Sequence, residues 1–455
     1  MKSLSRCVFL MVVLLSLAAC GDEKGGAAGE QDPVPDAGAD TQEPSEDLPP
    51  EQEDAEPQDA DEPDPEDTDG PDEPDMDEVD TGQPDADEPD LPPDDQCDLS
   101  AKGDENKDRV VLIGHPFAQE VGQQGTTLTS MTLRATGELV RDGVRLDVGV
   151  RVGRIEFVPS GQFALVLGER DELISLRVDG AGALTEVGRV ELPGADYGDI
   201  VMMDNGRTAF IVGSNVNETS GISVVNIGCD GSIELLSEAF FNLRLTRSMA
   251  LRPGQQSAVL LGGQTAFEPI DDDDLRLLER DGDGWRQTGA FDIFGDFIDA
   301  ERIGLSPDGQ LLLIPNGSVF SEEGSQVSVV AIEGDGAREV NRLTDLPDAR
   351  EARFSPDGQS AIVTLLEPGR VAVLRRDGLN MVLVEEIRGI GLPEQIAAVE
   401  RGDLSGLVLL SSVDPQGGPN IAMLRFEGPG QVVDMGQVDL SEDFEDIPGP
   451  ITVQP

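Results

Sequence analysis

A short turn sequence that recurs at nearly regular intervals constrains the fold of this chain more than any other feature. Each of four clear copies has an apolar residue followed four positions later by glycine, and three of them place proline between the two. A degenerate copy ends at Gly254 and a weaker one near Gly406, so that successive glycines lie 45, 48, 55, 49 and 48 residues apart. The clear copies end at Gly161, Gly206, Gly309 and Gly358.

Each copy is followed by a hydrophobic run of strand length, a polar loop, an alternating stretch and a second glycine-containing turn. Proline sets φ near the value that opens a turn, and an Asp-Gly or Asn-Gly pair supplies the positive φ of a tight hairpin. Helical periodicity is scarce. Repeats of this length with four short strands each indicate an all-β chain that folds as a β-propeller. The predicted second strands are residues 163–167, 208–212, 258–261, 311–314, 361–365 and 407–410.

The number of blades follows from the length of the repeated region. Residues 109–455 number 347, and this length divides into seven repeats of about 49 residues. Because two copies of the turn are degenerate, six or eight blades stay open. No turn precedes residues 110–113, which therefore read as the second strand of a blade. We expect residues 451–454 to supply the missing inner strand, which would close the ring and remove its free edges.

The Phe-Ser-Pro-Asp-Gly turn at residues 354–358, with its following apolar strand, resembles the YVTN and lactonase-like β-propellers and the propeller of Tol-type periplasmic proteins. The resemblance spans residues 109–455 and implies the same fold. Lactonase-like propellers include enzymes that open sugar lactones with histidine, arginine and acidic groups around the central channel. The resemblance therefore implies a hydrolase at the channel mouth as one function for this chain.

The sequence itself offers few catalytic residues. His115 is the single histidine, so a serine hydrolase or a lactonase would depend on it, and a loop position is the simpler interpretation. The chain has no Gly-x-Ser-x-Gly elbow and no second histidine for a zinc site. We therefore expect a non-catalytic platform that binds an envelope protein or a small ligand, with the lactonase-like hydrolase as the alternative.

Charged residues recur at one position of the inner strands, three before the apolar residue of the turn. Since inner strands line the channel of a propeller, these side chains should ring its mouth with both charge signs. They could form ion pairs that join the blades, or a pocket for a small anionic or zwitterionic ligand with arginine forks. The candidates are Arg154, Asp199, Arg302 and Glu351, with Arg353 beside them.

A run of four aspartates, Asp271, Asp272, Asp273 and Asp274, falls between the predicted second and third strands of one blade. Loops at that place share one face of a propeller with the connections between blades, and this is the usual binding face. Carboxylate oxygens are ligands for calcium, so the run could hold this cation. A solvated acidic loop is the simpler interpretation, and no other cofactor is indicated.

The N-terminus has the pattern of a secretion signal. Lys2 and Arg6 precede an apolar run that is too short for a permanent membrane span, and Leu-Ala-Ala-Cys follows. This ending resembles the lipobox of bacterial lipoproteins, which implies that residues 1–19 are removed and that Cys20 carries the lipid. We therefore expect a protein anchored to a membrane of the cell envelope, either periplasmic or exposed at the surface.

Residues 20–108 are predicted to be a disordered linker. From Gly21 to Ser100 the chain has 33 acidic residues, one basic residue, 14 prolines and no aromatic residue. Such a segment cannot bury enough apolar surface to offset its ordering entropy. Its charges repel one another, so it should extend and hold residues 109–455 away from the membrane.

Charge and cysteine usage limit the partners and the compartment. Residues 101–455 contain 58 acidic and 29 basic side chains (91 − 33 and 32 − 3), which leaves a net charge of −29. This charge disfavours nucleic acid, because phosphate binding needs clusters of Lys and Arg. Cys97 and Cys229 are the cysteines left outside the signal and the lipid site, and in an oxidising compartment they could pair or remain free. We expect a monomeric propeller.

Overall fold

The computed structural model describes most of the chain beyond residue 96, with gaps at loops. Cys20, the signal sequence, nearly all of the linker and Asp271–Asp273 lie outside the described residues. Among the described residues, no helix is long and apolar enough to cross a membrane. The described ranges are 97–117, 124–168, 171–193, 196–214, 220–241, 246–262, 274–282, 284–293, 302–317, 325–366, 369–413, 418–441 and 448–455.

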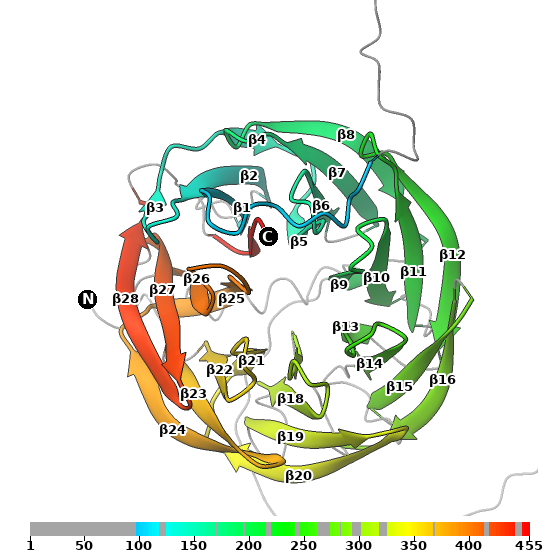
Figure 1. Ribbon diagram of the computed structural model, residues 1–455, viewed down its shortest axis with the longest axis vertical. Coiled ribbons are helices and arrows are strands. Elements are labelled where there is room, and N and C mark those ends of the chain that lie inside the picture. The colour runs from blue at the N-terminus through cyan, green and yellow to red at the C-terminus, as the bar shows by residue number, and fades with distance from the viewer. Residues whose placement is uncertain are drawn as a thin grey trace, which may run out of the picture. The chain divides into compact units, whose positions relative to one another are not determined.

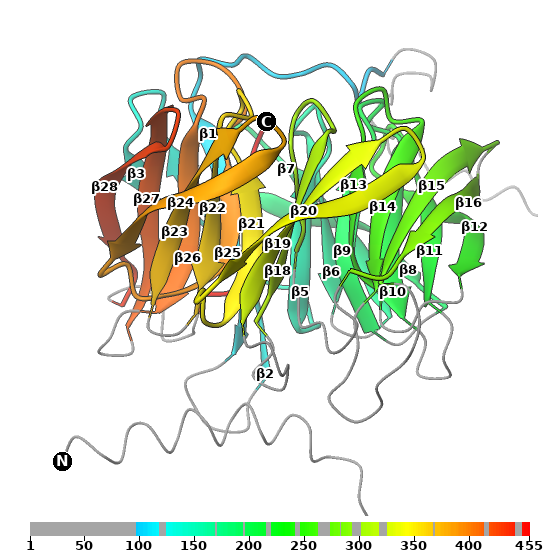
Figure 2. The same ribbon diagram turned by 90° about the horizontal axis from the view of Figure 1, so that it is seen from below.

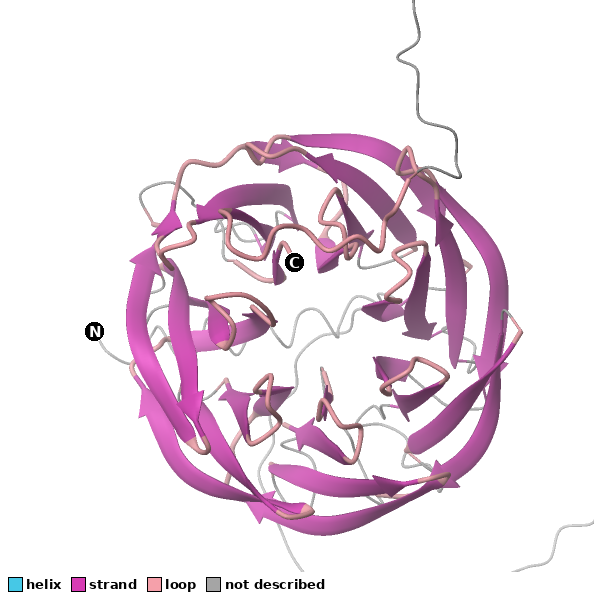
Figure 3. Ribbon diagram, viewed as in Figure 1, coloured by secondary structure: helices cyan, strands magenta, loops and turns pink. Residues whose placement is uncertain are grey.

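Seven antiparallel sheets stand around a central axis like the blades of a propeller (Figure 1), and every regular element is a strand (Figure 3). This confirms the all-β class and selects seven blades over six or eight. In chain order, inner strand to outer, blade 2 comprises β5 (Val152–Phe157), β6 (Phe163–Gly168), β7 (Glu172–Val178) and β8 (Leu184–Glu191); blade 3, β9 (Asp196–Met202), β10 (Thr208–Ser214), β11 (Ser220–Ile227) and β12 (Ile233–Phe241); blade 4, β13 (Thr246–Leu251), β14 (Ser257–Gly262), β15 (Leu275–Asp281) and β16 (Gly284–Phe291); blade 5, β17 (Gly304–Leu305), β18 (Leu311–Asn316), β19 (Gln326–Glu333) and β20 (Gly336–Thr344); blade 6, β21 (Ala349–Phe354), β22 (Ser360–Leu365), β23 (Arg370–Asp377) and β24 (Asn380–Arg388); blade 7, β25 (Leu392–Ala398), β26 (Leu407–Val413), β27 (Pro419–Gly428) and β28 (Gln431–Asp439).

Blade 1 joins the two ends of the repeated region. Its inner strand is β29 (Ile451–Val453), which pairs with β1 (Arg109–Phe117) so that Leu112 lies opposite Thr452. The remaining strands are β2 (Gln124–Leu133), β3 (Leu139–Val140) and β4 (Arg145–Asp147). The predicted closure of the ring is therefore observed, and the C-terminus lies near the axis beside β1 (Figure 1).

The recurring turn joins the inner strand of a blade to its second strand. In blade 5, Gly309 N donates to Ser306 O at 2.8 Å, and the Asp308 carboxylate accepts from Ser306 Oγ at 2.6 Å. Gly309 has a φ of +69°, which a residue with a side chain rarely adopts. Because blades 2 to 7 join their inner and second strands in sequence, these connections share one face of the ring, which we call the turn face (upper side in Figure 2).

The core lies between neighbouring blades. All six residues of β22 are buried, whereas only one of the nine residues of the outer strand β24 is buried. One apolar cluster joins blades 5 and 6 and includes Leu313 and Val363, and another joins blade 7 to the closing strand through Leu409 and Val453. Burying such a side chain contributes about 1.5–3 kcal/mol, so each blade depends on contact with the next.

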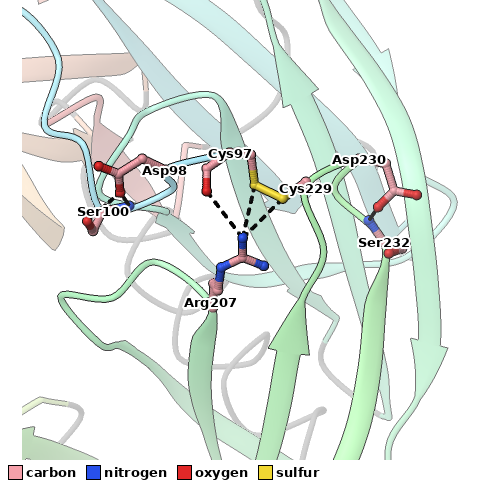
Figure 4. Close-up of a disulfide and its surroundings, with 7 residues drawn as sticks. All are labelled: Cys97, Asp98, Ser100, Arg207, Cys229, Asp230 and Ser232. Atoms are coloured by element: carbon pink, nitrogen blue, oxygen red, sulfur yellow. Dashed lines mark hydrogen bonds between the residues drawn. A yellow bond between two sulfur atoms is a disulfide. The ribbon is translucent and has the colours of Figure 1, made fainter. Parts of the chain in front are cut away.

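Residues 97–108, which we call the strap, run along the turn face before β1 begins (Figures 1 and 2). The strap starts at a disulfide between Cys97 and Cys229 of blade 3, with a Cα–Cα distance of 5.8 Å. Arg207 Nη2 donates to Cys97 O at 3.2 Å and points at the two sulfur atoms (Figure 4). Leu99 is 1% exposed, and its carbonyl accepts from Ser160 N at 3.0 Å.

Candidate functional site

Two adjoining cavities of about 480 and 210 Å³ occupy the channel where the inner strands approach the turn face. Walls of the larger cavity come from the final residues of β9, β13, β17, β21 and β25. Its volume is in the range of small-molecule sites in proteins. Five charged residues line both cavities: Glu156, Arg302, Arg353, Glu400 and Arg401.

Deeper along the channel wall, a ring of polar contacts links the inner strands. Arg154 Nε of blade 2 lies 3.5 Å from Asp199 Oδ1 of blade 3, and Asp199 Oδ2 accepts from Ser248 Oγ of blade 4 at 2.9 Å. Glu351 of blade 6 accepts from Ile396 N of blade 7 at 2.9 Å. Arg154, Asp199, Ser248 and Glu351 are at most 4% exposed, so these contacts tie the blades together away from solvent.

Arg302 connects this ring to the cavities. Its nitrogens lie 3.7 Å from Asp199, 3.5 Å from Glu351 and 3.9 Å from Glu156. Burial opposes the charge of this guanidinium, but the attraction of Asp199, Glu351 and Glu156 outweighs it and raises the pKa of Arg302. Arg302 is therefore a fixed positive charge, and its 18% exposed side chain still faces the cavity.

Glu156 is the carboxylate with the most unusual electrostatics in the site. It lies near the end of β5, and its side chain is 31% exposed, into the cavities that it lines. Burial raises the pKa of Glu156 above the ordinary glutamate value, and this effect outweighs the opposing attraction of Arg302 and Arg353. A carboxylate of this kind holds a proton more readily than a solvated one, which suits proton transfer to and from a ligand.

Arg353 and Glu400 form an ion pair at the edge of the larger cavity, between blades 6 and 7. Their side chains are 33% and 65% exposed. The pair is thus open to solvent on one side, and the Arg353 guanidinium can exchange Glu400 for an anionic group of a ligand at little cost.

The charged residues predicted from the sequence separate into two groups. Arg154, Asp199 and Glu351 belong to the buried ring and line neither cavity, whereas Arg302 does both and Arg353 lines the cavities. The interpretation as contacts between blades therefore fits Arg154, Asp199 and Glu351, whereas a ligand pocket with Arg302 and Arg353 stays a prediction. The cavities open on the turn face. The sequence had favoured the opposite face for binding, which carries the loops between second and third strands and the connections between blades.

His115 and Asp274 occupy places that differ from the sequence interpretation. His115 is fully buried in β1, its Nε2 lies 2.9 Å from Thr129 Oγ1, and it lines neither cavity, so a hydrolase acting at these cavities would not use it. Asp274 is 4% exposed and accepts from Ile293 N at 2.9 Å, which is not a solvated loop position. Among the described residues, no cluster of His, Cys, Asp or Glu could hold a metal ion.

Sequence reasoning missed Glu156, although a signal was present. Glu156 stands one position before Phe157 of its turn, and Arg353 stands one position before Phe354, so both share one offset in the repeat. Residues at this offset point into the cavities in both blades. By contrast, Lys102 and Arg109 line the smaller cavity because of the path of the strap. No local sequence pattern predicts this path.

No protein-family model and no curated protein sequence matches the chain. Solved structures do. A Bacteroides uniformis protein to which 6-phosphogluconolactonase activity is ascribed aligns with a TM-score of 0.59 at 15% identity, over 76% of this chain and 99% of its own. The periplasmic gluconolactonase of Pseudomonas aeruginosa aligns with a TM-score of 0.57 at 14% identity, over 77% and 99%. These neighbours are lactonase-like β-propellers.

The likeness shows the fold alone. A hypothetical selenium-binding protein from Sulfolobus tokodaii aligns equally well, with a TM-score of 0.59 at 11% identity, over 78% of this chain and 97% of its own. One fold hosts unrelated functions, so the activity of this chain has to be argued from its cavities.

Proposed function

We propose that the domain binds a small polyhydroxylated lactone in the larger cavity and hydrolyses it with Glu156 as general base. One observation carries the proposal: Glu156 lines a cavity of about 480 Å³, and its Oε2 lies 3.9 Å from Arg302 Nη2. The lactonase-like neighbours favour this function over a purely non-catalytic platform.

The chemistry needs a base for water and a positive charge for the developing oxyanion. In the proposed step, water held by Glu156 attacks the lactone carbonyl carbon and gives its proton to the carboxylate. The carbonyl oxygen becomes an oxyanion beside the Arg353 guanidinium. Collapse then breaks the ring C–O bond, the ring oxygen takes the proton back from Glu156, and a hydroxy acid leaves.

The test measures hydrolysis of a panel of sugar lactones by the full chain. Glu156→Gln removes the base and should lower kcat/KM by about a hundredfold or more. Glu333→Gln is the matched control, because Glu333 is 65% exposed in a distant outer region of blade 5 and lines neither cavity. Wild-type protein without turnover, or Glu156→Gln with wild-type turnover, would refute hydrolysis at this site.

A non-catalytic binding platform is the second candidate. It is favoured by the commitment of Arg302 to three carboxylates, which suits a rigid scaffold better than a mobile catalytic group. Calorimetry with gluconate, the product-like acid, separates the two functions. Saturable binding together with absent turnover would support the platform.

We also propose that the protein is a monomeric lipoprotein of the cell envelope, anchored through Cys20. The disulfide between Cys97 and Cys229 supports an oxidising compartment, because structural disulfides are rare in the bacterial cytosol. Mass spectrometry of the N-terminal peptide tests the anchor: a diacylglyceryl mass on Cys20 is expected, and Cys20→Ala should release the protein from membranes. An unmodified Cys20 would exclude the anchor.

A further inference from the structure

The smaller cavity contains a buried cation with unusual partners. Arg109 is 2% exposed, and its guanidinium donates to Gln454 O at 3.1 Å and to the carbonyls of Glu105 and Arg401 at 3.0 Å each. These three acceptors are neutral. Among the described residues, no carboxylate oxygen lies within 4.0 Å of its nitrogens, and its buried Nε has no hydrogen-bond partner. The guanidinium of Arg109 is thus hydrogen-bonded only to backbone carbonyls, and the Glu105 carboxylate acts on its charge from beyond 4.0 Å.

Two further cations stand close to Arg109. Arg401 forms an ion pair with Glu105 at 3.3 Å. Burial lowers the pKa of Arg109, and the positive charge of Arg401 lowers it further. Lys102, on the strap, lines the same cavity and has no ion-pair partner among the described residues. Arg109 and Arg401 therefore share the carboxylate of Glu105.

This local excess of positive charge contrasts with the rest of the molecule. Residues 101–455 carry a net charge of −29, from 58 acidic and 29 basic side chains. The side chains that line the smaller cavity reverse this balance, because five are cations and three are carboxylates; the last residue, Pro455, lines it as well. A buried charge is costly unless it is paired and hydrogen-bonded, so an anion bound in this cavity would offset part of that cost. The cations are Lys102, Arg109, Arg302, Arg353 and Arg401; the carboxylates are Glu156, Asp204 and Glu400.

We infer that the smaller cavity binds an oxyanion, a phosphate or carboxylate group, between Lys102 of the strap, Arg109 of β1 and Arg401 of blade 7. Arg109 supplies the buried positive field, and Lys102 and Arg401 supply donors that can turn toward the anion. The oxyanion is either a free ion or the charged end of a ligand whose body lies in the adjoining larger cavity. The inference does not depend on lactone hydrolysis.

The strap makes this site conditional on the disulfide. Lys102 and Glu105 lie five and eight residues after Cys97, and the strap also bonds to blade 7 where Asp403 N donates to Asn106 Oδ1 at 3.2 Å. The strap is thus fixed at both ends. Opening of the disulfide would free its first end and loosen the wall that carries Lys102.

Calorimetric titration of the full chain with inorganic phosphate, at constant ionic strength, tests the inference. We expect saturable binding of one ion, weakened about tenfold by Lys102→Gln and about tenfold by Arg401→Gln, since each removes a charged hydrogen bond. Lys107→Gln is the matched control, because Lys107 lies on the same strap but lines neither cavity, and it should bind like wild type. Arg109 is left unchanged because it also holds three backbone carbonyls.

Titrations with gluconate and glucose 6-phosphate distinguish the two sources of the oxyanion. Tighter binding of either compound than of phosphate, lost in Lys102→Gln, identifies the charged end of a larger ligand. Equal or weaker binding identifies a free ion. Absence of saturable binding for all three compounds, or wild-type affinity in the Lys102→Gln/Arg401→Gln double variant, would overturn the inference. None of these readouts requires lactone turnover, so the oxyanion site and the hydrolase fail separately.

Discussion

Arg154 Nη1 donates to Gln395 Oε1 at 2.5 Å, although 241 residues separate the two in sequence. Arg154 belongs to blade 2 and Gln395 to blade 7, so the bond passes across the short closing strand of blade 1. Together with the contacts through Asp199, Arg302 and Glu351, it completes a polar circuit around the axis. Two of its contacts, Arg154–Gln395 and Asp199–Arg302, join blades that are not neighbours in the ring.

Replacement of Arg154 should therefore lower the free energy of unfolding by more than replacement of an exposed arginine does. Arg154→Leu leaves the fully buried Asp199 without its nearer guanidinium and should lower the free energy of unfolding by about 3 kcal/mol. Urea denaturation measures this change. Arg134→Leu is the control, because its pair with Glu138 has side chains 50% and 62% exposed and should change stability by about 0.5 kcal/mol. Equal effects of the two substitutions would contradict a structural role of the circuit.

The raised pKa of Glu156 predicts a pH-dependent cost of its charge. Because burial raises this pKa above the ordinary glutamate value, the folded state favours the protonated acid more than the unfolded state does. The stabilisation from the protonated form is present below pH 4.5 and is lost as pH rises through the folded pKa. Glu156→Gln keeps a neutral side chain throughout. Its stability relative to wild type should therefore increase as pH rises from 4 to 7 in parallel denaturations; a decrease would mean that Arg302 and Arg353 dominate.

The disulfide should stabilise the domain substantially, because it joins residues 132 positions apart. Replacing both Cys97 and Cys229 by serine should lower the free energy of unfolding by about 2–5 kcal/mol. Reductant should destabilise wild type similarly and leave the double variant unchanged. Limited proteolysis should also cut residues 97–108 faster in the variant. A strap that stays protected without the disulfide would show that its packing on blades 2 and 7 suffices.

Gln454 is expected to be important for ring closure. Its Oε1 accepts from Val110 N at 3.2 Å and its Nε2 donates to Gly161 O at 2.7 Å, so one side chain links the end of β29 to blades 1 and 2. Gln454→Ala leaves these buried backbone groups unsatisfied and should cost about 1–3 kcal/mol. Amide hydrogen exchange should accelerate first in β29 and β1. Gln437→Ala, which removes an exposed bond to Gly389 O, should leave exchange there unchanged.

The sequence predicted the parts of the fold that depend on local geometry. A turn such as 354–358 needs its proline, aspartate and positive-φ glycine in fixed order, and the apolar run after it has the length of one buried strand. The closing strand was predictable because the first blade visibly lacked an inner strand. The turns and strand lengths depend on near neighbours along the chain, and the closing strand followed from the count of strands, so one sequence suffices to predict them.

The candidate site was predictable only in part, because it depends on contacts between distant segments. Glu351 and Arg353 are two positions apart on β21, and their spacing did not tell which side chain enters the buried ring and which lines the cavity. His115 was expected at a loop position, with a catalytic role only in a hydrolase, whereas the structure buries it inside β1. Arg401 and Lys102 come together through a strap whose path is fixed by a disulfide.

The pairing of β29 with β1 also dictates an order of events during biogenesis. The first blade takes its innermost strand from residues 451–453, so its sheet remains incomplete until that segment has been synthesised. A nascent chain emerging from a ribosome or a translocation pore therefore exposes an open sheet edge for nearly the whole time. We therefore expect the nascent chain to need chaperones until residues 451–453 have been synthesised. Deletion of these residues should cause aggregation and not a folded ring of lower stability.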